Sequence, residues 1–149
     1  MKLEDEIKQD KFRNEYHKLA VNIFYTYGWL LRSQSKFFDG FDLTPQQFNI
    51  LRILRGQYPN SATINLLKER MLDKMSDASR LVERLRLKGW VERTTAEDDR
   101  RCAKVIITNK GLELLSKIDK LEQEADQTLT NLTQKEAQQL NELLDKLRR

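Results

Sequence analysis

The sequence is poor in the residues that form disulfides, turns and metal sites. Its 149 residues include one cysteine, one histidine, two prolines and five glycines. One cysteine cannot form an internal disulfide, and one histidine leaves little for a His/Cys metal site, so we expect no metal. So few prolines and glycines disfavour an all-β sandwich or barrel and favour a mainly helical chain.

Long apolar runs are also missing. None approaches the roughly 18 residues that span a membrane, and residues 1–5 carry too much charge for a secretory signal. We therefore expect a cytoplasmic protein with no membrane partner. The length indicates one domain over residues 1–149.

The inventory of chemistry-bearing residues argues against catalysis. The glycines are isolated from one another, so no glycine-rich loop is present to cradle a phosphate. The single histidine has no serine or cysteine pattern around it that would form a nucleophilic site. The sequence therefore predicts a protein that is not an enzyme and has no cofactor.

Positive charge is concentrated in the middle of the chain. The formal net charge is +4, but residues 1–43 are neutral, residues 44–108 carry +5 and residues 109–149 carry −1. A basic middle between nearly neutral arms indicates that the middle meets a polyanion. A mildly basic, solvated face is the alternative interpretation.

Helical periodicity and capping residues predict four helices in the first part of the chain, up to about residue 88. An amphipathic helix is predicted over about residues 12–38, and a capping box at residues 44–47 starts the next helix, with a buried stripe of Phe48, Leu51 and Leu54. Thr63 can cap a short third helix, and Ser76 a fourth that runs to about residue 88.

The fourth predicted helix has one apolar and one polar face. Ala78, Val82 and Leu85 share the first, and small polar and arginine side chains occupy the second. Two short helices joined by a tight turn, the second with such an outer face, are typical of a helix-turn-helix. Residues 91–94 and 102–107 predict a hairpin with a charged loop between its strands, which would form a wing.

Two more helices are expected after the hairpin. Thr108 and Gly111 begin a long helix with a coiled-coil-like seam at Leu114, Ile118, Leu121 and Ala125. A capping box at residues 133–136 begins the last, striped by Ala137, Leu140, Leu144 and Leu147. The first helix of the same chain or the helices of a second copy can cover these stripes. We favour a homodimer, because helices at both ends present more apolar surface than one small domain covers.

Four runs of residues, in this order and spacing, resemble the MarR family of bacterial transcriptional regulators. They are MSDASRLVERL at 75–85, KGWVER at 88–93, DRR at 99–101 and ITNKG at 107–111. Trp90 and Asp98 depart from the family's commoner residues. The resemblance implies a winged helix-turn-helix at 44–108 between dimerisation helices at 1–43 and 109–149. It further implies a homodimeric repressor that binds double-stranded DNA at a pseudo-palindromic operator.

The candidate DNA-binding residues lie on the fourth predicted helix and the hairpin. They are Ser76, Asp77, Ser79, Arg80, Arg84, Arg93, Asp99, Arg100 and Arg101. The resemblance implies an Asp-x-Arg wing motif at Asp99 and Arg101, in which the arginine enters the minor groove and the aspartate holds it. A solvated turn with exposed ion pairs is the alternative. A winged-helix protein used for protein contacts or non-specific nucleic-acid binding is the alternative function.

The resemblance also implies a small aromatic acid or phenol as an effector that releases the DNA. Aromatic side chains near the end of the first predicted helix are candidates for its pocket, with ordinary core as the alternative; we single out Tyr25, Trp29, Phe38 and Phe41 from a group that also holds Phe24 and Phe37. Cys102 follows two arginines, which lower a thiol pKa, so it is either a redox switch or an inert strand residue.

Overall fold

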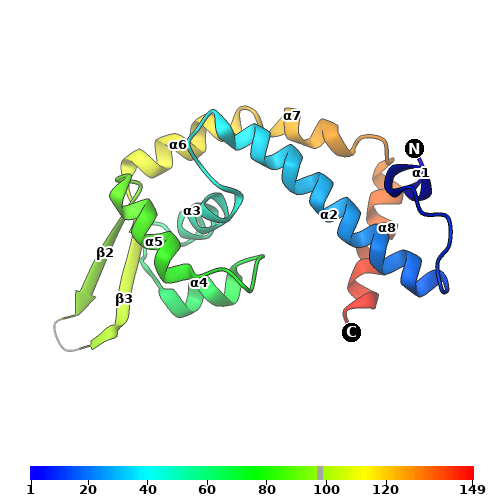
Figure 1. Ribbon diagram of the computed structural model, residues 1–149. Coiled ribbons are helices and arrows are strands. Elements are labelled where there is room, and N and C mark those ends of the chain that lie inside the picture. Colours follow the sequence, from blue (N-terminus) through cyan, green and yellow to red (C-terminus); the bar gives the residue numbers. More distant parts are fainter. Residues whose placement is uncertain (97–98) are drawn as a thin grey trace. The chain divides into compact units, whose positions relative to one another are not determined.

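The computed structural model describes residues 1–96 and 99–149, with side chains described for residues 1–94 and 103–149 (Figure 1). These residues form two compact units, residues 1–45 and 46–149. Helices dominate the described chain, and its small sheet has three strands. The predicted mainly α fold with a small β wing is confirmed.

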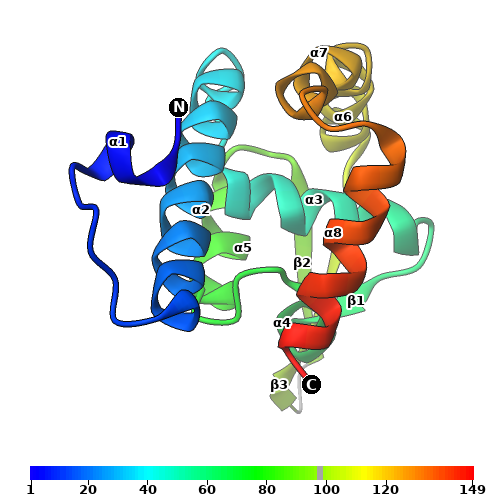
Figure 2. The same ribbon diagram turned by 90° about the vertical axis from the view of Figure 1, so that its right-hand side faces the viewer.

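The first unit contains α1 (Leu3–Ile7) and α2 (Glu15–Asp39) (Figure 2). α2 starts at Asn14, whose side-chain oxygen accepts a hydrogen bond from the His17 backbone N–H at 2.9 Å. This contact satisfies one of the free N–H groups at the start of the helix. The predicted end at about residue 38 is confirmed, since α2 ends at Asp39 and Gly40 is the C-cap. The short α1 was not predicted.

The second unit contains the remaining elements, apart from the first residue of α3. In chain order they are α3 (Pro45–Gln57), β1 (Ala62–Thr63), α4 (Ile64–Arg70), α5 (Ala78–Leu87), β2 (Val91–Ala96), β3 (Asp99–Ile107), α6 (Asn109–Asp119), α7 (Glu122–Asp126), the 3-10 helix Gln127–Leu129 and α8 (Gln134–Leu147). The side chains of Thr63, Thr108 and Thr133 each accept a backbone hydrogen bond where α4, α6 and α8 start. The sequence predicted all three of these starts.

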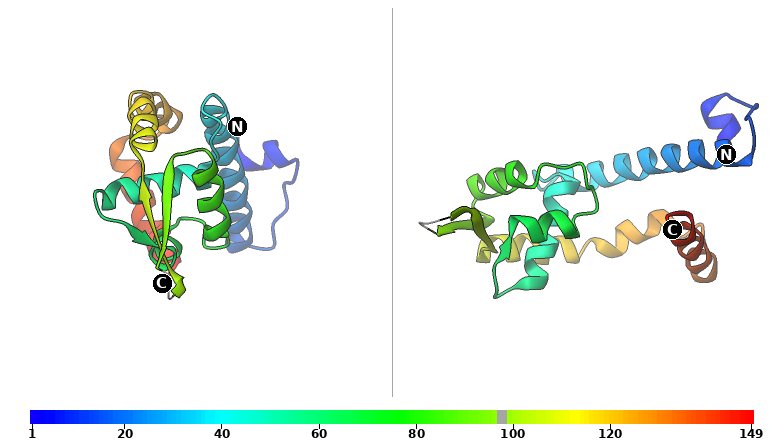
Figure 3. Two further views of the ribbon diagram at one scale, coloured as in Figure 1. Left: turned by 90° about the vertical axis from the view of Figure 1, so that its left-hand side faces the viewer. Right: turned by 90° about the horizontal axis from the view of Figure 1, so that it is seen from below.

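The strands form an antiparallel sheet in the order β1–β3–β2. Arg93 of β2 and Ala62 of β1 both pair with Val105, on opposite edges of β3. Figure 3 shows β2 and β3 side by side, with α5 packed next to β2. β1 was not predicted, because two residues are too few to show a strand periodicity.

The core of the second unit draws on α3, α4, α5, β3 and α6. Its large, fully buried side chains include Ile50, Leu51, Leu54, Leu67, Val82, Leu85, Val105, Leu115 and Ile118. Burying one such side chain stabilises a fold by about 1.5–3 kcal/mol. Of the stripe predicted for α3, Phe48 is half-buried, and Ile50 and Ile53 are buried on that helix as well. This core fixes α4, α5 and the hairpin relative to one another.

The start of α5 lies one residue later than predicted. Asp77, not Ser76, is the N-cap, and its Oδ1 accepts a hydrogen bond from the Arg80 N–H at 3.1 Å. Both residue types cap helices well. Starting at Ala78 places Ala78, Val82 and Leu85 together in the core, where all three are fully buried.

The long helix predicted after Thr108 is interrupted. α6 ends at Asp119 and α7 begins at Glu122. Of the predicted seam, Ile118 is fully buried, whereas Ala125 is exposed. The seam therefore does not continue past α6, and the prediction of one continuous helix was wrong.

Candidate nucleic-acid interface

The turn between α4 and α5 is held by side chains on both sides of it. Asn49 of α3 accepts a hydrogen bond from the Leu72 N–H at 2.9 Å. The Lys74 ammonium donates to the carbonyl oxygens of Lys68 and Glu69 at the end of α4. A cation at this position satisfies carbonyls that the helix leaves unpaired and complements the helix dipole. The turn thus fixes where α5 begins.

α5 presents a polar face on the side opposite its buried residues. Ser79, Arg80 and Arg84 are exposed on this outer face, and Asp77 is exposed at its start. Within the described part of the chain, neither Arg80 nor Arg84 forms an ion pair. The sequence predicted these residues, and the structure brings them onto one exposed surface.

A carboxylate–guanidinium pair lies on the same helix and was not predicted. Arg86 donates two hydrogen bonds to Glu83, at 3.0 and 2.7 Å. These bonds hold the pKa of the Glu83 carboxyl below its ordinary value, so both groups stay charged at neutral pH. Their spacing of three residues was the available signal. Among the described residues, the positive charge of α5 that is not paired with a carboxylate therefore comes from Arg80 and Arg84.

The remaining predicted DNA-binding residues are less uniformly exposed. Ser76 and Arg93 are half-buried, and Arg93 Nε is buried with no hydrogen-bond partner among the described residues. Arg93 and Arg86 line a hollow of about 420 Å³ beside the hairpin. Asp99, Arg100 and Arg101 lie at the start of β3, and their side chains, like that of Cys102, are outside the described residues.

The corner between β3 and α6 joins the hairpin to the C-terminal helices. The Thr108 hydroxyl donates to the Gly89 carbonyl at 2.7 Å, and Lys110 donates to the Lys88 carbonyl at 2.9 Å. Trp90, one of the two departures from the family pattern, is buried here, with the Lys88 ammonium 4.9 Å from its ring centroid. Trp90 is therefore part of the support of the hairpin.

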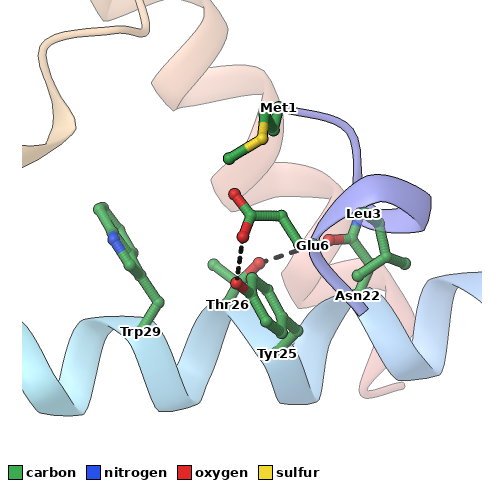
Figure 4. A pocket seen from close by; sticks show the side chains of 7 residues that line it. All are labelled: Met1, Leu3, Glu6, Asn22, Tyr25, Thr26 and Trp29. Atoms are coloured by element: carbon green, nitrogen blue, oxygen red, sulfur yellow. Dashed lines mark hydrogen bonds between the residues drawn. The ribbon is translucent and has the colours of Figure 1, made fainter. Parts of the chain in front are cut away.

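The aromatic residues predicted for an effector pocket separate into two groups. Phe38 and Phe41 gather around Phe37, at ring-centroid distances of 5.0 and 6.2 Å from it. Tyr25 and Trp29 instead line a pocket of about 330 Å³ between α1 and α2, together with Met1, Leu3, Glu6, Asn22 and Thr26 (Figure 4). The four residues predicted for an effector pocket thus lie at two places, Tyr25 and Trp29 within α2 and Phe38 and Phe41 at and just beyond its end.

The described residues contain no group of three or more His, Cys, Asp or Glu side chains arranged to hold a metal ion. No helix among them is long and apolar enough to cross a membrane.

A short helix, a fixed turn, a second helix with an exposed basic face and an adjoining β hairpin define a winged helix-turn-helix protein. The model of the MarR family matches residues 41–101, which include α4, α5 and β2. The chain is 30% identical to wild-type MarR of Escherichia coli, whose structure it matches with a TM-score of 0.66 over 87% of this chain and 96% of that one. The chain belongs to the MarR family.

Other relatives are transcription regulators as well. A mutant of E. coli MarR in complex with operator DNA is 28% identical, with a TM-score of 0.78 over 93% of this chain and 99% of that one. The transcriptional repressor MprA of E. coli strain K12 is 28% identical over 60% of this chain; the match spans 51%, about half, of MprA. An organohalide-sensing regulator in its 2,4-dichlorophenol-bound form shares the fold, with a TM-score of 0.81 at 21% identity over 94% of this chain and 85% of that one.

Proposed function

We propose that this chain is a sequence-specific transcriptional regulator that binds double-stranded DNA with α5 as its recognition helix. The observation that carries the proposal is the division of α5 into a fully buried face and an exposed face with Ser79, Arg80 and Arg84. Small side chains near the helix start let it approach the base edges of the major groove, and arginine pairs bidentately with guanine. The operator complex of E. coli MarR, 28% identical to this chain, supports the same use of the fold.

The residues around α5 supply the backbone contacts in this proposal. Ser76 and Asp77 stand at the start of the recognition helix, and Arg93 and Arg100 lie on the strands of the hairpin. Arg101 enters the minor groove next to the major-groove site, with Asp99 holding its guanidinium in place. A narrow A·T-rich minor groove concentrates negative potential, which favours an arginine there.

We propose that the regulator is a homodimer. α8 leaves apolar side chains uncovered: Leu140, Leu143 and Leu147 are 45%, 63% and 52% exposed. On α2, Tyr16 and Phe24 are 83% and 75% exposed. Helices of a second copy would bury these side chains, and the two recognition helices would then take half-sites about 10 bp apart, centre to centre, in a pseudo-palindrome. Sedimentation equilibrium of the purified protein measures the stoichiometry, and a monomer at micromolar concentration contradicts this part.

Repression and control by an effector complete the proposal. MprA, 28% identical over the matched region, is a transcriptional repressor, which favours repression as the direction of regulation. The pocket between α1 and α2, with the rings of Tyr25 and Trp29, supports binding of a small effector. Its volume of about 330 Å³ is at the lower end of ligand pockets, which span about 300–1,000 Å³.

Selection of binding sites from random duplex DNA tests the function. The selected site should be a pseudo-palindrome, and the protein should bind it about 10³- to 10⁷-fold more tightly than random DNA at the same salt concentration. Equal affinity for selected and random DNA would instead assign the chain to non-specific nucleic-acid binding. Salt dependence alone does not separate the two, because phosphate contacts dominate both. No measurable DNA binding would leave the basic face for protein contacts.

A further inference from the structure

The pocket between α1 and α2 combines one carboxylate with two large aromatic rings. Tyr25 and Trp29 are four residues apart and therefore rise from the same face of α2. Figure 4 shows both rings on the side of α2 that faces Glu6 of α1. The Tyr25 hydroxyl donates a hydrogen bond of 2.8 Å to Glu6 Oε2. A carboxylate has about four lone-pair sites, so this bond leaves Glu6 with acceptor capacity toward the pocket.

The charged side chain in the lining of this pocket is Glu6, and the lining also includes Met1, which carries the α-amino group of the chain. Glu6 carries the only formal charge among the lining side chains, which are otherwise neutral in the described chain. Of the cations on α2, Lys18 is paired with Glu4. The Arg32 guanidinium lies beside Gly28, one turn earlier on the helix, and its charge opposes the rise in the pKa of Tyr25. The hydrogen bond to Glu6 raises the pKa of the Tyr25 phenol, so Tyr25 stays a neutral donor.

We propose that this pocket binds a small organic cation, an ammonium that carries an apolar or aromatic group. The Glu6 carboxylate would neutralise the ammonium, and the faces of Trp29 and Tyr25 would attract it through their ring quadrupoles, for which tryptophan is the best side chain. Leu3, which is buried, gives the apolar group a surface to pack on. A carboxylate ligand of the same size is repelled by Glu6, and none of the described side chains in the lining carries a positive charge. The inference deepens the effector part of the proposed function, on which its regulatory consequence rests.

Calorimetric titration of the purified full chain with benzyltrimethylammonium tests the binding directly, without DNA. We expect one site per chain, and we expect benzoate, which has the same ring and the opposite charge, to bind at least tenfold more weakly. Glu6→Gln keeps the shape and an acceptor for Tyr25 but removes the charge, so it should weaken binding of the cation about fivefold or more. Trp29→Leu should weaken it about two- to thirtyfold, the range of a cation–π contact.

Asp5→Asn is the matched control, because Asp5 lies on α1 next to Glu6, carries the same charge and does not line the pocket. It should bind the cation as the wild type does. Equal affinities of the wild type and Glu6→Gln, or benzoate binding as tightly as the cation, would overturn the proposal. The comparison of cation and benzoate uses only the wild type, so it decides the question even if Glu6→Gln detaches α1.

The proposed function and this inference fail in different ways. A protein that prefers its selected operator but binds no benzyltrimethylammonium refutes the cation site alone. A protein that binds the cation in one site but shows no preference for any DNA refutes the proposed regulator and leaves the site. If both hold, saturating cation should change operator affinity, and an unchanged affinity would remove the regulatory consequence.

Discussion

Replacing Gly111 by alanine should destabilise the second unit, although alanine normally favours a helix. A Cβ at this position of α6 would lie against the Trp90 carbonyl oxygen and 2.7 Å from Cγ1 of Ile107, closer than real Cβ contacts. The gain in helix propensity is about 0.8–1 kcal/mol, whereas overpacking costs about 1–3 kcal/mol. Because the nearest atom is the main-chain oxygen of Trp90, a change of side-chain rotamer cannot relieve this contact. We expect a net loss of up to about 2 kcal/mol, measured by urea unfolding.

Gly56→Ala is the matched control for this prediction. Gly56 lies in α3, and a Cβ there would meet no atom within 4 Å. The same substitution should therefore stabilise the protein by up to about 1 kcal/mol, a rise in Tm of roughly 2–4 °C for a chain of this size. If both variants raise the stability equally, the corner has room for a side chain, and the tight packing of Trp90 on Gly111 is refuted.

Three further outcomes follow from the site and the helix caps. Arg84→Ala should reduce the slope of log affinity for DNA against log salt concentration by about 0.9 if Arg84 neutralises one phosphate. Arg148→Ala, at a residue beyond α8, should leave this slope unchanged. A slope reduced in Arg148→Ala but not in Arg84→Ala would show that α5 does not contact the DNA. Asp77→Ala should cost about 0.5–2 kcal/mol of unfolding free energy through the lost cap of α5, and Ser76→Ala should change it by less than about 0.5 kcal/mol. The pKa of Glu136 is lowered by hydrogen bonds from the Thr133 backbone N–H and hydroxyl, so its contribution is present above the unfolded-state pKa of about 4.3 and is lost as pH falls through the lower folded-state pKa. The stability difference between the wild type and Glu136→Gln should therefore shrink on acidification from pH 6 to pH 3, and a constant difference would contradict the capping box.

The helix starts were predictable because capping is decided within four residues. Thr63, Thr108 and Thr133 each have the hydroxyl that a free backbone N–H at the helix start requires, and each is used. The same rule could not choose between Ser76 and Asp77, which are adjacent and equally competent. Burial decided between them, because the helix must begin where Ala78 points into the core.

The interruption between α6 and α7 was not predictable from local pattern. Asp119 accepts two hydrogen bonds from Arg55, at 2.7 and 3.1 Å, and Glu122 pairs with Arg52. These partners lie 64 and 70 residues away along the chain. In the sequence the two carboxylates resemble any solvated helix face, so periodicity extended the helix across them.

Some residues of the candidate interface were likewise predictable from the local sequence, and others were not. Ser79, Arg80 and Arg84 follow from helical spacing alone, since three apolar positions fix the opposite face of α5. The half-burial of Arg93 depends on the sheet register, which pairs it with Val105. The grouping of Tyr25 and Trp29 with Glu6 depends on α1, a five-residue helix too short to be recognised from periodicity.

The ion pairs also lower the amount of positive charge in residues 44–108 that can contact DNA. Two of the 13 basic residues within 44–108, Arg52 and Arg55, are neutralised by carboxylates from outside that segment. Counting charges along the sequence therefore overstates the positive charge that is free to meet DNA. Arg52→Ala removes the same formal charge as Arg84→Ala, but from a side chain already paired with Glu122, and it should leave the salt slope of DNA binding within about 0.3 of the wild type. A slope reduced as much as in Arg84→Ala would show that total charge, rather than the exposed arginines of α5, governs the interaction with DNA.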